Sequence, residues 1–384
     1  MKIVMVTEYL APEDKPYFGG VDARTVNLAK CLAKNNDVQI ITSFTENGKR
    51  MESYDGFKIH RVGKTRRFTQ RGDFLQRLNF KSEAISKILR LRPDIVDGSG
   101  FVSYAGCYAG AEKIGIPSVA TVHEVWQGEW IQNMGLINGF AGHFLEKQYL
   151  KYNFGGYVSV SSFTKEKLIE KIGIDEEKIV VIYNGIDLDL YKTTKIDGKY
   201  EDPTIVTICR LVSYKRVDDL IRAVKALKTD FQNIKLKIIG DGPQKEALKT
   251  LSKTLGVEDN VDFLGKVSDT QDVIKVLKKS HVFALPSIVE GFGMVIIEAM
   301  AAGIPYVASD IRPIREVTSG GVGGLLSKPK NCEDLALKIR TLLVDESKRN
   351  SVMKNASKHI SNYKWNNLAC KLEKWYGELC DGGQ

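Results

Sequence analysis

The sequence predicts an α/β protein with two doubly wound, Rossmann-like domains. Apolar runs of strand length alternate with segments of helical periodicity along the whole chain, a pattern typical of parallel sheets covered by helices. A polar, turn-rich interval at residues 184–203 interrupts this alternation, and an apolar run at residues 204–209 starts it again. The length of 384 residues is also more than one domain usually contains.

The first domain is expected to span residues 1–190. The short apolar run at its start ends directly at Thr7 and Glu8, so we expect a first strand there and no secretory signal. Amphipathic segments, for example at residues 21–34, 74–91 and 164–171, are expected to form helices between the strands. The expected strands cover residues 2–7, 38–42, 57–62, 94–97, 118–122, 156–160 and 179–182.

The second domain is expected to span residues 191–364, with strands at residues 204–209, 236–240, 261–264, 281–285 and 305–308. The glycine-rich run at residues 320–324 is expected to be a flexible turn. An amphipathic helix at residues 365–379 has no strand after it, so we expect residues 365–384 to pack back across the domain junction. Ligands of such sheets bind beyond the carboxyl ends of the strands, which directs attention to the loops there.

The composition is that of an ordinary soluble globular protein, with 43% hydrophobic and 27% charged residues. No segment approaches the roughly 20 apolar residues that cross a bilayer. The six cysteines are scattered without a Cys-x-x-Cys pair, which favours a reducing cytoplasm and argues against a metal site. The net charge of +9 suggests an anionic partner, but no nucleic-acid recognition motif accompanies it, so we expect no nucleic acid.

The strongest functional signal lies between two glutamates, Glu290 and Glu298, directly after an apolar strand. Helical spacing begins at Met294, so Glu290 falls in the strand-to-helix turn and Glu298 about a turn and a half into the helix. Unpaired amides and the helix dipole favour an anion at such a helix start. The alternative is that the glycines only permit a tight turn. The candidates are Glu290, Gly291, Phe292, Gly293, Met294, Val295 and Glu298.

Two cations follow the strand at residues 204–209, namely Arg210 and Lys215. Arginine presents a planar fork to phosphate oxygens, and lysine a compact charge. Cations directly before a helix oppose its dipole, and a bound anion would explain them. The alternative is a solvated basic helix start.

Three other loops follow strands. One contains Gly240 and Gly242, before Pro243 at an expected helix start. Its backbone allows close approach of a ligand group such as a nucleotide base or ribose. Gly19 and Gly20 open the first helix, where paired glycines let backbone amides approach a diphosphate; a merely flexible loop is the alternative. His123 follows the strand at residues 118–122, where ligands bind, although a lone histidine is more often structural.

Together these residues and the run Asn184-Gly-Ile-Asp187 resemble the retaining glycosyltransferases of family four, which have the GT-B fold of two Rossmann-like domains facing a central cleft. The resemblance covers essentially the whole chain and is most specific at residues 263–317. It implies that Arg210 and Lys215 hold the diphosphate of a UDP- or GDP-sugar and that Glu298 holds its ribose. It also implies that Glu290 and the amides of Phe292 and Gly293 contact the transferred sugar.

The resemblance further implies that His123 borders the reaction centre, so His123 and Glu290 are the catalytic candidates, and that Gly19 and Gly20 close on the phosphates. Weaker donor-side candidates are Asn184, Gly240, Gly242 and Val267. The sequence departs from the family at two positions. Cys209 stands where glycine is common before the arginine, and Glu124 where aspartate is frequent after the histidine.

The expected reaction moves a sugar from a nucleotide diphosphate sugar to a hydroxyl acceptor with retention of configuration. The resemblance favours front-face attack with the departing phosphate as the base. Arg210, Lys215 and the helix start would stabilise the leaving group, so we expect no metal and no other cofactor. Asp187-Leu-Asp189 matches the Asp-x-Asp metal motif of the other major glycosyltransferase fold, but its position between the domains indicates a structural segment.

The acceptor is expected to bind the first domain. Between Lys58 and Lys81 the chain has eight basic residues and one acid, Asp73, with aromatic residues between them. Residues 130–145 carry no charged residue and many apolar ones. Both segments could meet an anionic membrane surface or a lipid-linked acceptor at the cytoplasmic face of a membrane. Alternatively, Leu78 and its neighbours form a core face below solvated charges. The candidates are Arg66, Arg67, Arg71 and Trp130.

Two other functions use the same fold. A sugar-nucleotide epimerase or hydrolase should lack the set of Arg210, Lys215, Glu290 and Glu298. A non-catalytic sugar-nucleotide-binding protein would keep only part of it, whereas every expected donor ligand is present here.

Overall fold

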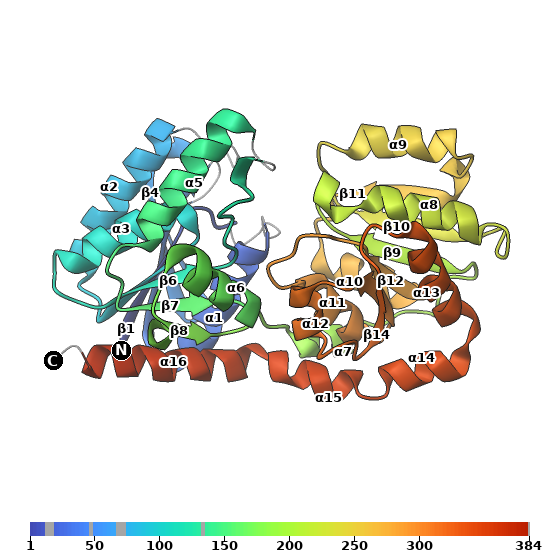
Figure 1. The fold of residues 1–384 in the computed structure, drawn as a ribbon. Helices are drawn as coiled ribbons and strands as arrows, with labels where there is room; N and C mark the ends of the chain where they lie inside the picture. Colours follow the sequence, from blue (N-terminus) through green and yellow to red (C-terminus); the bar gives the residue numbers. More distant parts are fainter. Residues whose placement is uncertain (12–18, 46–48, 67–73, 132–134, 383–384) are drawn as a thin grey trace. The chain divides into compact units, whose positions relative to one another are not determined.

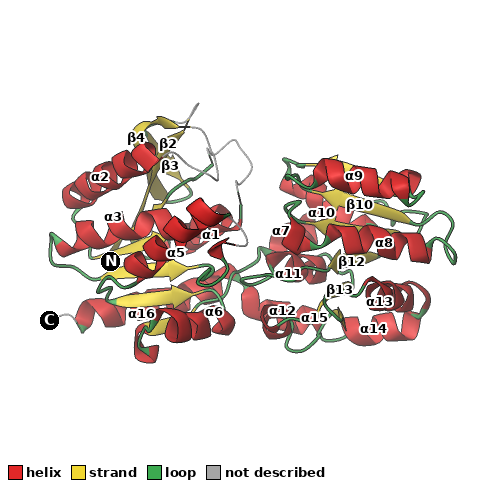
Figure 2. Ribbon diagram, turned by 45° about the horizontal axis from the view of Figure 1, so that its top comes forward, coloured by secondary structure: helices red, strands yellow, loops and turns green. Residues whose placement is uncertain are grey.

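The computed structural model of the protein describes residues 1–11, 19–45, 49–66, 74–131 and 135–382. It contains two compact units, one formed by Met1–Gly185 with Trp365–Gln384, and the other by Ile186–Lys364. In each unit a sheet carries helices on both of its faces (Figure 1, Figure 2). No helix within the described ranges is both long and apolar enough to cross a bilayer.

The first unit contains an eight-stranded sheet in the order β3-β4-β2-β1-β5-β6-β7-β8. All neighbouring strands are parallel except the edge pair β3 and β4. The strands are β1 (Lys2–Thr7), β2 (Asp37–Thr45), β3 (Met51–Tyr54), β4 (Phe57–Arg66), β5 (Ile95–Ser99), β6 (Ser118–Val122), β7 (Gly156–Ser159) and β8 (Ile179–Val181).

The alternation of side chains along β1 explains how this unit builds two cores. Ile3 and Met5 face one layer of helices, and Val4 and Val6 face the other. The first layer contains α1 (Gly20–Leu32) and α16 (Trp365–Asp381), and the second contains α2 (Phe74–Leu91) and α3 (Phe101–Glu112). The described part of this unit also contains α5 (Leu136–Leu150) and α6 (Ser162–Lys167), and α6 continues as a π-helical turn at Leu168–Ile172.

The second unit contains a parallel six-stranded sheet in the order β11-β10-β9-β12-β13-β14. Its strands are β9 (Thr204–Ile208), β10 (Lys235–Ile239), β11 (Val261–Gly265), β12 (Val282–Leu285), β13 (Tyr306–Ser309) and β14 (Gly324–Ser327). Its helices are α7 (Leu188–Thr193), α8 (Val217–Leu227), α9 (Lys245–Thr254), α10 (Thr270–Lys279), α11 (Met294–Ala301), α12 (Arg312–Val317), α13 (Cys332–Val344), α14 (Glu346–Met353) and α15 (Ala356–Ile360).

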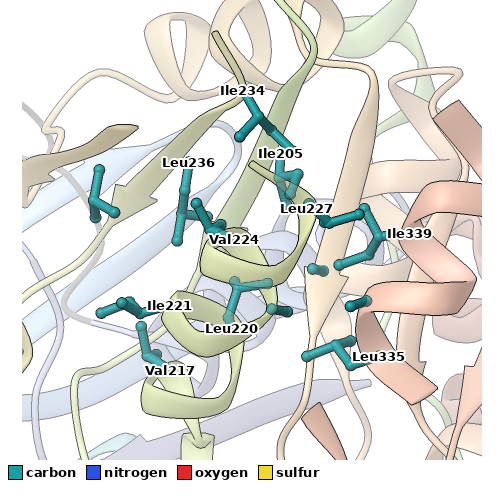
Figure 3. Packing of buried hydrophobic residues seen from close by; sticks show 14 of the residues in the cluster. Ile205, Val217, Leu220, Ile221, Val224, Leu227, Ile234, Leu236, Leu335 and Ile339 are labelled. Carbon is teal, nitrogen blue, oxygen red and sulfur yellow. The ribbon is translucent and has the colours of Figure 1, made fainter. Parts of the chain in front are cut away.

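One face of the second sheet is covered by α8 and α13. Side chains of α8 such as Leu220 and Val224 lie among Ile205 of β9, Leu236 of β10 and Ile339 of α13 (Figure 3). These residues are fully buried, which explains why apolar residues recur at helical spacing along α8.

Two strands were missed from the sequence. β3 pairs with β4 through a two-residue loop in which Asp55 and Gly56 both have positive φ, at 41° and 90°, the conformation of a tight hairpin turn. β14 begins at Gly324, which was expected to belong to a turn. A Cβ there would lie 2.2 Å from the carbonyl oxygen of Tyr306, so glycine allows close pairing with β13. Gly320–Gly323 do form a turn.

The chain leaves the first unit at Gly185 and returns to it at Trp365. The boundary expected after residue 190 lies inside α7, whose first amides donate to the Asp187 carboxylate, so the whole helix belongs to the second unit. The terminal helix α16 packs beside α1 in the first unit. Pro243, expected to begin a helix, lies in the turn before α9.

Both sheets reverse their strand order at one point. In the first sheet, chain order runs outward from β1 on one side and from β5 on the other; in the second, the pair is β9 and β12. The loops after such a pair lead away in opposite directions, which opens a crevice at the carboxyl edge. The segments after β1, β5, β9 and β12 therefore hold the positions best placed for a ligand.

A buried polar network ties α16 to the first sheet. The hydroxyls of Tyr376 and Thr121 donate to the Asp97 carboxylate, and the nearby Arg24 guanidinium donates to the carbonyls of Ile182 and Tyr183. Burial raises the pKa of Asp97, and these hydrogen bonds and the charge of Arg24 oppose that shift. Removal of one side chain from this network therefore leaves its hydrogen-bond partner buried and unsatisfied.

We expect Tyr376→Phe to lower the free energy of unfolding by about 1–3 kcal/mol, because the Asp97 carboxylate loses a donor in a buried site. Denaturant titration measures this change. Tyr152→Phe is the matched control, since its ring is half-buried and its hydroxyl has no hydrogen bond among the described residues. Equal stability of the two variants would contradict the network.

Candidate functional site

The loops after β9 and β12 are joined at the carboxyl edge of the second sheet. The Ile288 amide donates to the Tyr214 carbonyl at 2.9 Å, and Lys215 Nζ lies 2.6 Å from Glu290 Oε1. Only 16% of the Lys215 side chain and 10% of the Glu290 side chain are exposed. Burial alone would lower the pKa of Lys215, but the charge and hydrogen bond of Glu290 raise it, so the lysine is charged. The sequence prediction did not foresee this ion pair.

Arg210 lies at the same edge of the sheet, in the segment after β9. Its side chain is exposed and has no ion pair or hydrogen bond within the described part of the chain. Arg216, by contrast, pairs with Asp218 and Asp219 at the start of α8, and those acids suit the positive end of the helix dipole. The structure therefore brings Arg210 and Lys215 to one loop as expected, and leaves Arg210 available to an anion.

The first turn of α11 lies beside this ion pair in the chain. Gly293 has a φ of +93°, a left-handed conformation that glycine adopts without strain. Among the described residues, no backbone acceptor is present for the amides of Gly293, Met294 and Val295. Phe292 is 4% exposed and packs edge-on against Tyr363, so its ring belongs to the core.

Glu298 lies on the second turn of α11 and is partly buried. Burial raises its pKa to about 7, well above that of an ordinary glutamate. No hydrogen bond to its carboxylate exists within the described ranges. An acceptor that has lost water without gaining a donor is suited to the hydroxyls of a ligand.

Three of the four weaker candidates have a structural role, and Val267 has none that the structure shows. A Cβ at Gly240 would lie 1.9 Å from the carbonyl oxygen of Cys209, and one at Gly242 would lie 2.5 Å from that of Leu211. The close approach expected from these glycines is therefore made by the loop after β9. Asn184 lies in the first unit and accepts a hydrogen bond from the buried Arg24. Val267 is half-buried in the loop after β11.

His123 lies at the carboxyl edge of the first sheet, directly after β6. Its Nε2 is 2.9 Å from the hydroxyl oxygen of Ser99, the buried last residue of β5. Burial, with a smaller contribution from Arg24, lowers the pKa of His123 to about 3, so the imidazole is neutral near pH 7. Ser99 was not predicted from the sequence, although it too ends a strand beside the reversal of strand order.

Gly19 and Gly20 begin α1, and both are exposed. Gly19 is in extended backbone, which any residue adopts, and no described atom lies within 4 Å of a Cβ built at either position. The described part of the fold therefore gives no reason for glycine here. Phe18, which precedes them, lies outside the described residues.

Trp130 is held in place by a residue that the sequence did not reveal. The buried Glu146 of α5 accepts hydrogen bonds from the Trp126 amide, the Gln127 side chain and the Trp130 indole, each at 2.9 Å. Burial raises the pKa of Glu146 even so. The segment after His123 is thereby fixed to α5.

Two residues of the basic stretch form ion pairs within the first unit. Arg61 is buried, donating to the carbonyls of Leu10 and Ala11 and pairing with Glu52, and Arg77 pairs with Glu8. Leu78, which the alternative interpretation places in a core face, is 46% exposed. Arg66 ends β4, while Arg67 and Arg71 lie outside the described residues.

Within the described ranges, no three histidine, cysteine, aspartate or glutamate side chains are grouped as metal ligands. Asp187 of the Asp-x-Asp sequence caps α7 instead, and the neighbouring Asp189 carboxylate is exposed.

Comparison with known proteins assigns the chain to a family. Residues 18–190 match the model of Glycosyltransferase Family 4, and residues 192–359 match that of Glycosyl transferases group 1. An uncharacterized glycosyltransferase of Methanocaldococcus jannaschii is 30% identical over 388 residues, which cover 96% of each chain. The protein belongs to the group 1 glycosyltransferases. The family resemblance read from the sequence is thereby confirmed.

Solved glycosyltransferase structures share the fold of this chain. Sucrose-phosphate synthase from Thermosynechococcus elongatus superposes with a TM-score of 0.85 at 18% identity, covering 99% of both chains. The Anabaena protein HepE in complex with UDP-glucose superposes with a TM-score of 0.76 at 19% identity, covering 98% of this chain and 100% of that one. The predicted GT-B fold, with two parallel-sheet units, is confirmed.

We expect the isosteric change Glu298→Gln to stabilise this glycosyltransferase at pH 8 by on the order of 2 kcal/mol, with little effect at pH 5. The raised pKa means that the folded state holds the proton more tightly than the unfolded state. The stabilising effect of that proton is complete below the ordinary glutamate pKa and is lost as pH rises through about 7. Melting temperatures across this pH range measure the difference.

Glu258→Gln is the control, because Glu258 is exposed in the same unit. A stability difference between wild type and Glu298→Gln that does not change with pH would show that Glu298 ionises as an ordinary surface carboxylate.

Proposed function

We propose that the protein is a retaining, metal-independent glycosyltransferase that moves a sugar from a nucleotide diphosphate sugar to a hydroxyl acceptor. The observation that carries this proposal is the Lys215–Glu290 ion pair at the reversal of strand order in the second sheet, in one loop with Arg210, which has no ion pair among the described residues. Ligands of doubly wound sheets bind at that position. The Anabaena structure named above contains UDP-glucose, a donor of the proposed class.

The diphosphate would bind at the start of α11. Arg210 and Lys215 supply two positive charges, and the amides of Gly293, Met294 and Val295 supply donors aligned with the helix dipole. These groups are in place before the sugar–phosphate bond breaks, so they would stabilise the leaving diphosphate without reorganising. They would take the role that a divalent cation has in other transferases.

The two carboxylates would divide the rest of the donor between them. Glu298 would accept hydrogen bonds from the ribose hydroxyls, which would restore its charged form. Glu290 binds Lys215 in the absence of a donor. Once Lys215 also binds the diphosphate, Glu290 would contact the transferred sugar. The acceptor hydroxyl would attack from the side of the departing phosphate, with that phosphate as the base.

The first unit would serve the acceptor side. Neutral His123, oriented by Ser99, can donate or accept a proton in a hydrogen bond without bringing a charge to the reaction centre. Gly19 and Gly20, where no described atom lies within 4 Å of an added Cβ, would let backbone amides approach a phosphate group. The acceptor would be a glycan or a lipid-linked hydroxyl at the cytoplasmic face of a membrane, where the enzyme would be a peripheral protein.

We expect Glu290→Gln to lower sugar transfer by roughly 10²-fold or more while the protein remains folded, because the amide cannot stabilise positive charge at the transferred sugar. A screen of UDP- and GDP-sugars for transfer and donor hydrolysis, with the anomeric configuration of the product read by NMR, identifies the donor for the assay. Asp272→Asn is the matched control, since it also removes the carboxylate of a lysine ion pair, here an exposed one with Lys275.

Near-normal transfer by Glu290→Gln would remove Glu290 from the reaction. The assay buffer contains EDTA, so activity that returns only with a divalent cation would contradict the role given to Arg210 and Lys215. An epimerised free nucleotide sugar as the product would instead indicate an epimerase.

A further inference from the structure

Helix α5 in the first unit has an unusual outward face. Leu136, Phe140 and Phe144 recur at every fourth position, which places them along one side of the helix. They are 77%, 70% and 56% exposed, respectively. Aromatic and aliphatic side chains that are exposed in a row indicate an interaction surface.

The opposite face of α5 is fixed to the protein. A Cβ at Gly142 would lie 2.4 Å from the Trp130 ring, and one at Gly139 would lie 2.6 Å from the Ile131 backbone, so both glycines allow tight packing. Glu146 on the same side accepts the three hydrogen bonds described above. The helix therefore cannot turn its apolar row inward without breaking this buried contact.

The charged residues on the outward side of α5 lie at its C-terminal end. Lys147 and Lys151 continue the outward row beyond Phe144, and both are exposed without an ion pair in the described part of the chain. Glu146 is the single acid of α5, and it is buried. The outward row is thus apolar in its first half, basic at its end, and free of acidic side chains.

We propose that this outward face of α5 adsorbs to an anionic lipid bilayer, with Leu136, Phe140 and Phe144 in the interface and the two lysines at the phosphate level. Interfacial helices combine these two features. A second copy of the chain fits less well, because an antiparallel pairing would set each lysine pair against an apolar row without an acid. The proposal rests on the proposed function only in that an acceptor borne by a lipid would bring the substrate to the same surface.

The surface draws on one of the two segments expected from the sequence. In the other segment, the basic stretch, Arg61 pairs with Glu52 and Arg77 with Glu8. The apolar residues of α5 come from the uncharged segment that the sequence analysis singled out, and only the structure shows which of them face outward.

The test is flotation with vesicles of phosphatidylglycerol and phosphatidylcholine in equal parts, at low salt and without any nucleotide sugar. Wild type is expected to bind these vesicles and to ignore vesicles of phosphatidylcholine alone. The pair Phe140→Ser with Phe144→Ser should lower the partition coefficient at least about tenfold, from the loss of apolar burial. The pair Lys147→Glu with Lys151→Glu should also lower the partition coefficient at least about tenfold, because anionic lipids attract lysine and repel glutamate.

Leu337→Ser with Val344→Ser is the matched control, since these side chains are 57% and 53% exposed on α13 of the other unit. This pair should bind as wild type does, and all variants should keep the melting temperature because the substituted residues are exposed. The charge pair keeps the test decisive if the serine pair does not fold.

Failure of wild type to bind anionic vesicles at low salt would overturn the proposal, whether or not sugar transfer is found. So would binding that neither α5 pair reduces, or a dimer that Phe140→Ser dissociates while vesicles are ignored. If binding depends on α5 but no sugar is transferred to any acceptor, the surface stands and the proposed function falls.

Discussion

The parallel direction of the strands is the constraint on which the candidate site depends. Because β9 and β12 are neighbours that point the same way, the segments after them reach one edge although 75 positions separate Lys215 from Glu290. Chain order reverses between the same two strands, and doubly wound sheets bind ligands at such a reversal. In the first unit, β5 and β6 bring Ser99 to His123 in the same way.

Partly buried charges distinguish the candidate site from the rest of the fold. In the first unit, the buried Arg24 and Asp97 are hydrogen-bonded to residues from other parts of the unit. A buried charge with a structural role requires such bonds. At the second edge, Glu298 lacks a hydrogen bond in the described structure and its pKa is raised, while Arg210 has no counter-charge there. A buried carboxyl group without a donor, such as that of Glu298, reduces stability, a cost commonly found where a ligand supplies the missing hydrogen bonds.

Sequence patterns were informative where a signal is local. Apolar runs located the long parallel strands, and strand ends located Arg210, Lys215, Glu290 and His123 as candidates. β3 escaped because its residues alternate in exposure without an apolar run, although Asp55-Gly56 is a recognisable hairpin turn. Ser99 contacts His123 24 residues away and Glu146 contacts Trp130 16 residues away, and the burial of Arg61 depends on carbonyls from another loop. Such contacts have no signature in the local sequence.

The central claim is that the second edge holds the diphosphate of the donor through Arg210 and Lys215. Calorimetric titration of the wild type, Arg210→Ala and Lys215→Ala with a nucleoside diphosphate and with its nucleoside tests it most directly. Both substitutions should lower the affinity for the diphosphate at least about tenfold, as expected for lost charge-assisted hydrogen bonds. The affinity for the nucleoside should be nearly unaffected. Equal losses for both ligands, or no loss for the diphosphate, would contradict the account.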